Sequence, residues 1–212
     1  KDQSYFLHVL TSADLDKALF PLGELTKVQV REKARVFGLP VATKPDSQGL
    51  CFVGDVSMRD FLKRFIDVEA GSVMNIQDEI IGTHEGAALY TIGQRHGFTV
   101  LKSMPDATAY YVVAIDTKQN VITVSPNRSD AEVSRALVRD MHWISGEKPP
   151  SDTQLRAQAR YHEQLVDVVV AESQGTLCVE FSKPHIVSPG QSIVLYSGET
   201  VLGGGVIDKV NL

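Results

Sequence analysis

Residues 110–124 have the sequence YYVVAIDTKQNVITV, and this stretch decides the fold expected for the second half of the chain. Two apolar, β-branched runs flank the turn-forming pair Gln119-Asn120, an arrangement typical of a hairpin. Further apolar runs alternate with turn residues at 165–170, 177–181, 193–196 and 201–202. These intervals leave no room for crossover helices, so the pattern predicts an antiparallel barrel or sandwich.

The first quarter of the chain has the signals of helices instead. Thr11 or Ser12 can cap a short helix that contains Leu15 and Leu19 and stops before Pro21. This segment is therefore predicted to be helical up to residue 20.

Two more helices are predicted further on. Thr26 and Gln29 have the spacing of a capping box, and Gly38 and Pro40 end the helix that it starts. A third helix is indicated by apolar residues that share one helical face, namely Met58, Phe61, Leu62 and Phe65.

The expected fold class is therefore α+β. From Gly71 to Gly93 short strand-like runs lie among Gly and Asp, between the helices and the barrel. We expect a helical N-terminal part at 1–55, a small central α+β domain at 56–108 and a C-terminal antiparallel β-barrel at 109–212.

Composition limits the classes of function. The chain has 212 residues, a formal net charge of −5 and 43% hydrophobic residues, so it is expected to fold rather than remain disordered. No stretch approaches the ~18 apolar residues of a membrane-spanning helix, so no membrane partner is expected. The acidic balance argues against indiscriminate coating of nucleic acid, because that affinity comes from neutralised phosphates. A local basic patch is still allowed.

Cysteine usage and the first residues suggest a compartment. The two cysteines, Cys51 and Cys178, are too few for a disulfide framework. The chain starts at Lys1 with neither Met nor an apolar signal region, which suggests that something upstream was removed and gives no indication of secretion. The expected location is the reducing cytoplasm.

Cys51 is the most informative single residue. It lies in a loop between Gly49 and Gly54, where positive φ angles allow the backbone to fold around a substrate atom or a second thiol. Nearby N–H groups and the following helix would favour its thiolate. The alternative is a small buried hydrophobe between two apolar neighbours. Cys178 lies in an alternating strand and is expected in the barrel core.

Three polar or glycine-rich segments have two interpretations each. Arg160, Tyr161 and His162 suit phosphate contact plus base stacking, or form a solvated strand end. The glycine-rich turn at 86–97 could face phosphate or a partner domain, or simply cap a helix. The glycines at 203–205 lack a following Lys-Ser/Thr and a helix, so a bulge or tight barrel corner is favoured over a phosphate loop.

Together these segments resemble the bacterial tRNA-specific 2-thiouridylases. The matching motifs occur in the family's order and close to its spacing across essentially all 212 residues. They are KDQSYFL (1–7), LFPLGEL (19–25), DSQGLCFVG (46–54), YTIGQR (90–95), YVV (111–113), RY (160–161), SPGQS (188–192) and LGGG (202–205).

The resemblance implies an ATP-dependent tRNA-uridine 2-sulfurtransferase. In that reaction Mg-ATP adenylates O2 of the wobble uridine, pyrophosphate leaves, and a cysteine persulfide delivers sulfur to C2, which leaves 2-thiouridine and AMP. Cys51 stands where the family carries its persulfide cysteine, and a sulfur-relay donor protein would load it. The positions that match tRNA-contacting residues, and would orient the anticodon arm, are Lys1, Asp2, Gln3, Arg160, Tyr161 and Gln191.

One departure from the family concerns ATP. The family's Ser-Gly-Gly phosphate loop, an Asp and a second Cys lie upstream of the matched motifs, and no SGGxDS motif occurs in this sequence. We therefore expect residues 1–55 to be the C-terminal part of an α/β catalytic domain, with ATP bound by a missing N-terminal part. The fragment alone is expected to be inactive, and no metal site is expected in it.

Two functions of other classes stay open. One is a non-catalytic RNA-binding β-barrel module in which Cys51 is structural. The other is a protein-interaction domain that docks a sulfur-relay partner near the Cys51 loop. The reactivity of the Cys51 thiol and the binding of tRNA distinguish the three.

Overall fold

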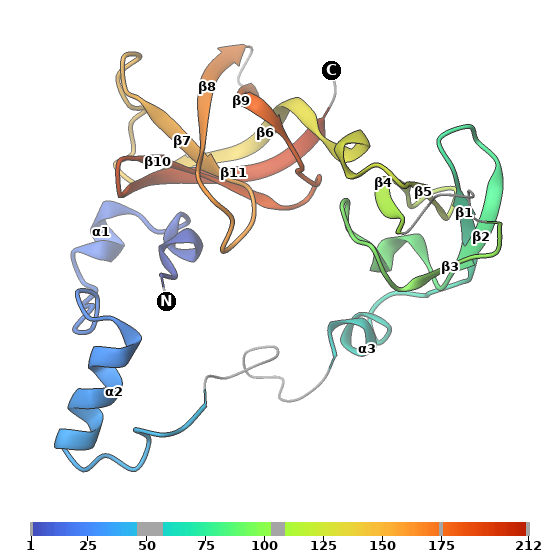
Figure 1. The fold of residues 1–212 in the computed structure, drawn as a ribbon. Coiled ribbons are helices and arrows are strands. Elements are labelled where there is room, and N and C mark those ends of the chain that lie inside the picture. The colour runs from blue at the N-terminus through green and yellow to red at the C-terminus, as the bar shows by residue number, and fades with distance from the viewer. Residues whose placement is uncertain (1, 46–56, 103–108, 174–175, 211–212) are drawn as a thin grey trace.

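The computed structural model describes residues 2–45, 57–102, 109–173 and 176–210 (Figure 1). Its helical elements are η1 (Ser4–Leu7), α1 (Ser12–Leu15), α2 (Lys27–Val36), α3 (Met58–Leu62), η2 (Ala87–Leu89) and η3 (Arg128–Ala131). Its strands are β1 (Gly71–Met74), β2 (Ile80–His84), β3 (Phe98–Val100), β4 (Tyr111–Asp116), β5 (Val121–Ser125), β6 (Val133–Trp143), β7 (Leu155–Gln158), β8 (Val166–Ser173), β9 (Thr176–His185), β10 (Ser192–Ser197) and β11 (Thr200–Val210). In the described ranges, no helix is both long and apolar enough to cross a membrane.

Capping boxes start both α1 and α2. Thr11 Oγ1 accepts from the backbone N–H of Asp14 at 3.2 Å, and Thr26 Oγ1 accepts from that of Gln29 at 3.3 Å. The capping box at Thr26 is therefore confirmed. The prediction that the first helix contains Leu19 is wrong, because α1 has 4 residues and Leu19 is 86% exposed. A short helix depends on packing of an apolar face, and Leu19 supplies none here.

The hairpin predicted at 110–124 is confirmed as β4 and β5. The two strands pair antiparallel, with Val112 opposite Val124. Asn120 closes the turn in the left-handed region, with φ 54°. Its side-chain amide donates to the carbonyl of Glu69 at 3.0 Å and its oxygen accepts from Ala87 N at 2.9 Å, so the turn is also tied to the rest of the central domain.

The hairpin joins the central sheet rather than the barrel. The sheet order is β3-β2-β1-β5-β4, and β5 pairs parallel to β1, with Val73 beside Ile122. These two residues and Val112 are fully buried in one core, separate from that of the barrel. The expected start of the barrel at residue 109 therefore differs from the structure, where the barrel begins at β6. A hairpin pattern does not specify which neighbouring strand the hairpin joins.

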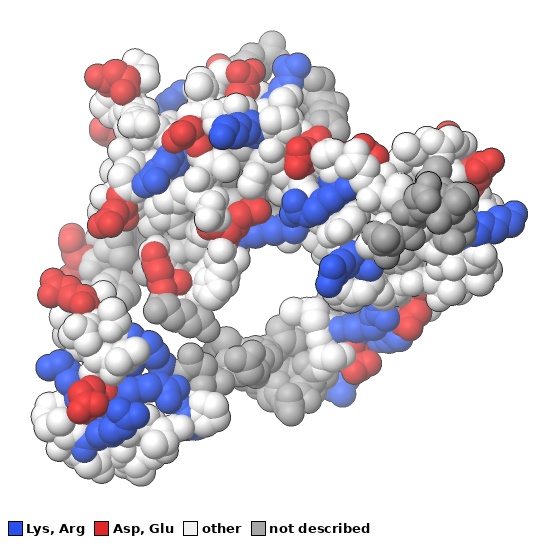
Figure 2. All heavy atoms as spheres, in the orientation of Figure 1, with Lys and Arg blue, Asp and Glu red and all other residues white. Residues whose placement is uncertain are grey.

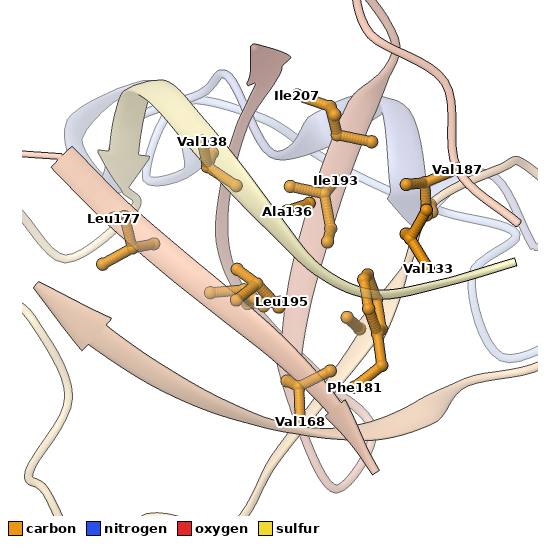
Figure 3. Packing of buried hydrophobic residues seen from close by; sticks show 13 residues of the cluster. Val133, Ala136, Val138, Val168, Leu177, Phe181, Val187, Ile193, Leu195 and Ile207 are labelled. Carbon is orange, nitrogen blue, oxygen red and sulfur yellow. The ribbon is translucent and has the colours of Figure 1, made fainter. Parts of the chain in front are cut away.

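Six strands form the closed barrel that the sequence predicts. Their order is β10-β11-β6-β9-β8-β7, and β7 pairs back to β10. Neighbouring strands are antiparallel throughout. Figure 3 shows the apolar side chains that fill the interior, among them Val138, Leu177, Ile193, Leu195 and Ile207. Together with the helices and the central sheet, this barrel confirms the α+β class.

Cys178 does not lie in the barrel core. In β9 the buried core residues are Leu177, Val179 and Phe181, while Cys178 is only partly buried. Successive strand side chains point to opposite faces, so a residue between Leu177 and Val179 points away from the interior. The prediction that Cys178 lies in the barrel core is therefore wrong, because the alternation in β9 buries its two neighbours instead.

The N-terminal segment packs on the outside of the barrel (Figure 1). The hydroxyl of Tyr5 donates to the carbonyl of Ser192 at 2.8 Å. Further along, Ser12 donates from both N and Oγ to the carbonyl of Ile144, each at 2.9 Å. The residues of η1 and α1 are thereby tied to strands more than a hundred positions away.

The glycines of β11 allow this close packing. The register of β11 against β6 shifts between Gly204 and Val206, so the predicted bulge is confirmed. A Cβ added at Gly204 would lie 2.7 Å from both the His8 ring and the carbonyl of Ile193. Gly203 has a similar constraint, because its Cβ would lie 2.0 Å from the carbonyl of His142. Two backbones and a buried imidazole occupy the space that side chains would need.

Gly204→Ala should lower the free energy of unfolding by about 1–3 kcal/mol, because the new methyl group overlaps His8 and the neighbouring strand. Urea denaturation measures this cost. His8→Ala opens space for the methyl group, so the costs of the two substitutions should sum to more than the cost of the double variant. Strictly additive costs would contradict the proposed contact.

His84 makes stability depend on pH. The side chain is 4% exposed, and burial lowers the pKa of its imidazole from 6.5 because the charged form is disfavoured. Below pH 6.5 the unfolded chain therefore takes up this proton before the folded chain does. Stability is greatest above that pH and falls as the pH drops, by at most about 1.4 kcal/mol per pH unit for this residue.

Urea denaturation at pH 7.5 and pH 5.5 tests this dependence. His84→Gln should have a flatter pH profile than the wild type, since it removes the buried titrating group. His96→Gln removes an exposed imidazole and is the matched control. If the unfolding free energy of His84→Gln changes with pH as steeply as that of the wild type, His84 is not the source of the pH dependence.

Candidate functional site

Two turns of the barrel meet the N-terminal segment, which precedes both of them by more than 150 residues. The three segments are the N-terminal residues before and within η1, the turn after β7 and the turn before β10. Tyr5 of η1 bonds to the carbonyl of Ser192, and the ring of Phe6 lies 4.6 Å from that of Tyr161, centroid to centroid. The residues predicted to contact tRNA that the structure describes are brought together here: Asp2, Gln3, Arg160, Tyr161 and Gln191.

Asp2 and Gln3 organise the start of the chain. The carboxylate of Asp2 accepts from the backbone N–H of Ser4 at 2.8 Å, and this hydrogen bond lowers the pKa of Asp2. The carbonyl of Gln3 accepts from the N–H of Phe6 at 3.1 Å, which closes the first turn of η1. Both side chains are exposed, so they remain available to a ligand.

Arg160 is the centre of the polar part of the site. Its Nη2 donates to the carbonyl of Ile92 at 2.6 Å and to Ser188 Oγ at 3.3 Å. Its Nε donates to Gln191 Oε1 at 3.3 Å. One guanidinium therefore connects the central domain to the turn before β10 and orients Gln191.

The loop that Arg160 contacts is the glycine-rich turn at 86–97. Gly93 donates to the carbonyl of Val112 at 2.7 Å, and Val112 donates back to the carbonyl of Gln94 at 2.8 Å. Gly93 has φ +83°, and a Cβ there would lie 3.3 Å from the Ile186 side chain of the barrel. Of the alternatives for this turn, contact with a partner domain is the one that the structure supports.

Four aromatic rings form a cluster next to the turn that follows β7. The ring centroids of Tyr5 and Tyr161 are 6.1 Å apart, and those of Tyr161 and His162 are 4.0 Å apart. Phe6 is 51% exposed, and His162 is exposed with φ 69°. The sequence indicates Tyr161 and His162 as candidates but gives no such sign for Tyr5 and Phe6, although both stand in the KDQSYFL motif. Exposure of an apolar ring has no sequence signal.

A largely buried pair of polar side chains, His185 and Glu163, lies near Tyr5. His185 Nε2 and Glu163 Oε2 are 3.2 Å apart, with both side chains largely buried. The carbonyl of Glu163 accepts from Gln158 at 2.6 Å, and Gln158 accepts in turn from the hydroxyl of Tyr196.

Burial, with smaller contributions from the charges of Tyr196 and Glu163, raises the pKa of Tyr5, which therefore stays a hydrogen-bond donor at neutral pH.

Charge on the rest of the visible face is mixed. Figure 2 shows Lys and Arg side chains interspersed with Asp and Glu over the barrel, and a concentration of basic side chains over α2. In α2 four basic residues accompany the single acid Glu32, and they are Lys27, Arg31, Lys33 and Arg35. The overall charge allows a local basic patch, and a count of charges over residues 27–36 locates it at this helix.

Two predicted site residues, Cys51 and Lys1, lie outside the described residues. The other cysteine, Cys178, lies on β9 and faces away from the barrel interior. Within the ranges that the structure describes, no cluster of three or more His, Cys, Asp or Glu residues could hold a metal ion. The described site is thus a surface of aromatic and hydrogen-bonding groups around Arg160.

Three family models match consecutive parts of the chain. The tRNA methyl transferase HUP domain matches residues 1–55, and the tRNA methyl transferase PRC-barrel domain matches residues 59–126. The aminomethyltransferase β-barrel domain matches residues 133–207. The second and third ranges agree with the central sheet and the closed barrel of the structure.

Curated relatives match nearly the whole chain. The tRNA-specific 2-thiouridylase MnmA of Cupriavidus metallidurans is 40% identical over 212 residues, which cover 98% of this chain and 59% of the relative. The proteins of the same name from Ralstonia pickettii and Shewanella oneidensis are 42% and 38% identical, over 98% and 99% of this chain. The chain spans between 57% and 59% of the length of these three relatives.

Arg160→Ala should loosen the contact between the central domain and the barrel. It removes three charge-assisted hydrogen bonds, so we expect a loss of about 2–4 kcal/mol in unfolding free energy. Faster amide hydrogen exchange around Ile92 should accompany it. Arg160→Lys keeps the charge but not the planar fork, and should restore only part of the loss.

Arg156→Ala provides the matched control. Arg156 also donates to a backbone carbonyl, that of Gly198 at 2.7 Å, but it is at an exposed site within the barrel. Its loss should cost less than about 1 kcal/mol and leave exchange around Ile92 unchanged. Equal effects of the two substitutions would refute a specific role for Arg160 between the domains.

Proposed function

Because the chain belongs to the family of tRNA-specific 2-thiouridylases, we propose that it supplies the tRNA-binding surface and the sulfur-carrying cysteine of such an enzyme. The observation that carries the proposal is the convergence of the matched residues around Arg160. Arg160 bonds to Gln191, and the helix η1 that follows Asp2 and Gln3 packs on Tyr161 through Tyr5 and Phe6, so the positions that resemble tRNA contacts lie on neighbouring segments. The ATP-dependent activity would belong to the whole protein.

The RNA-binding half of the proposal rests on Arg160 and its neighbours. Two of its nitrogens, Nε and Nη2, already bond within the protein, so the planar group is held in place. Its Nη1 makes none of these bonds and is the group that would donate to a phosphate or a carbonyl of the anticodon arm. Gln191, Asp2 and Gln3 would add neutral and acidic hydrogen-bonding partners beside it.

A few placed contacts agree with the charge of the chain. At a net charge of −5, binding cannot depend on a broadly positive surface. Lys1 beside Asp2 and Gln3, together with Arg160, would provide local positive charge at the site, and α2 offers further basic residues. Each neutralised phosphate releases counterions, so affinity should fall steeply with salt concentration.

The sulfur-transfer half assigns Cys51 as the carrier. A donor protein would transfer sulfane sulfur to the Cys51 thiolate and form a persulfide. The terminal sulfur would then attack C2 of the activated wobble uridine and displace the activated oxygen. A second thiol would cleave the resulting S–S bond, so that the sulfur stays on the base and the two cysteines end as a disulfide.

The described residues do not fit ATP. The N-terminus of α2 is occupied by its own capping box, since the N–H of Gln29 donates to Thr26. The glycines at 203–205 lie in β11, where neighbouring backbone and side-chain atoms fill the space that a cradle would need. We therefore assign no ATP contact to these residues, and the proposal for this chain is limited to sulfur and RNA.

Cys51→Ser should abolish sulfur transfer in the full-length protein, by at least about 100-fold, because an alcohol cannot form a persulfide. The measurement is single-turnover formation of 2-thiouridine in tRNA, read by mass spectrometry of the nucleosides. Cys178→Ser is the matched control and should keep the wild-type rate, since it replaces the other cysteine of the chain.

The same variants separate the rival functions. Trapping of the persulfide with an alkylating reagent should label Cys51 and be lost in Cys51→Ser. If Cys51→Ser keeps single-turnover thiolation, the sulfur-carrier role is wrong. If in addition tRNA still binds, the chain is an RNA-binding module with a structural Cys51.

A further inference from the structure

We propose that the exposed rings of Phe6 and His162, with Tyr161 between them, form a stacking platform for an unpaired base of the bound RNA. This inference rests on the proposed function and extends it to two residues, Phe6 and His162, that the matched tRNA contacts do not include. The ligand class is a single-stranded stretch of RNA, such as the loop of an anticodon arm.

The rings form a continuous row that ends in solvent. The centroid distances are 4.6 Å from Phe6 to Tyr161 and 4.0 Å from Tyr161 to His162, with the planes tilted by 51° and 42°. Phe6 is 51% exposed and His162 is exposed, whereas Tyr161 between them is partly buried. Two ring faces at the ends of the row are therefore available, and the central ring supports them.

The protein holds these rings in place before any ligand binds. Phe6 follows Tyr5, whose hydroxyl is fixed to the carbonyl of Ser192, and its own N–H donates to the carbonyl of Gln3. His162 lies in a turn that the N–H of Glu163 closes on the carbonyl of Arg160 at 3.1 Å. The backbone that carries the rings is therefore ordered before binding, which lowers the entropy lost in the complex.

The left-handed conformation of His162 sets the direction of its ring. Its φ of 69° lies in the left-handed region, which residues other than Gly enter rarely and which His, Asn and Asp enter more often than the rest. This turn places the imidazole against the Tyr161 ring instead of leaving it to rotate freely.

The chemistry of the surroundings favours a nucleobase over an apolar peptide. Arg160 precedes Tyr161 directly in the chain, and Asp2 and Gln3 precede η1, so polar residues flank the ring-bearing residues in sequence. A nucleotide presents the aromatic face of its base to the rings and a charged phosphate to the guanidinium, and unpaired bases in RNA are commonly recognised by such stacking. Every base has a π-face, so the platform would select unpaired RNA rather than a base identity.

The test uses the full-length protein and an anticodon stem-loop RNA with 2-aminopurine at successive loop positions. Stacking on the rings should quench the fluorescence of at least one of these positions. Phe6→Ala and His162→Asn should each weaken binding about 10-fold and remove that quenching. Asn is chosen because it tolerates the positive φ at 162.

Phe20→Ala is the matched control, since Phe20 is a phenylalanine of similar exposure, 53%, outside the row. It should bind like the wild type. Phe6→Trp keeps an aromatic face and should retain both affinity and quenching, while circular dichroism checks that every variant is folded.

The outcomes separate the platform from the proposed function. If the wild type does not bind the stem-loop, the proposed RNA-binding function itself fails. If the wild type binds and both Phe6→Ala and His162→Asn bind with equal affinity and quenching, the platform is wrong while RNA binding stands. If Phe20→Ala weakens binding as much as Phe6→Ala and His162→Asn do, the platform is also wrong, because the effect is then not specific to these rings.

Discussion

The arrangement of the candidate site depends on one guanidinium, that of Arg160. It follows β7 of the barrel and donates to the carbonyl of Ile92 in the central domain, to Ser188 and to Gln191. A planar group with several donors can satisfy acceptors from separate segments at once, which a lysine ammonium on a flexible stem cannot do with the same geometry. The turn before β10 and the loop at 86–97 are therefore placed by the same side chain.

The N-terminal segment completes the surface through contacts of a different kind. Tyr5 bonds to the backbone beside Gln191, and His8 packs into space that exists only because residue 204 is glycine. The glycines at the bulge of β11 have no side chains, and this allows residues near the N-terminus to pack against the barrel. Part of the proposed binding surface is built from the segment that precedes the barrel by more than a hundred residues.

Several features could be predicted from local sequence because their causes are local. The capping box at Thr26, the hairpin at 110–124 and the bulge at the glycines of β11 all depend on neighbouring residues and their spacing. Errors arose where the cause was distant. The phase of Cys178 and the sheet joined by the hairpin depend on which strands pair, and the exposure of Leu19 depends on what packs against it.

The sequence by itself determined the α+β class, the antiparallel strands of the second half and the family, because periodicity, turn residues and ordered motifs are properties of the chain alone. It also indicated Asp2, Gln3, Arg160, Tyr161 and Gln191 as separate candidates. Only the tertiary structure decided that these residues share one surface and that Arg160 joins two domains there. It likewise revealed that the ring of Phe6 lies beside Tyr161. Distances between segments far apart in sequence are set by strand pairing and packing, which no local pattern encodes.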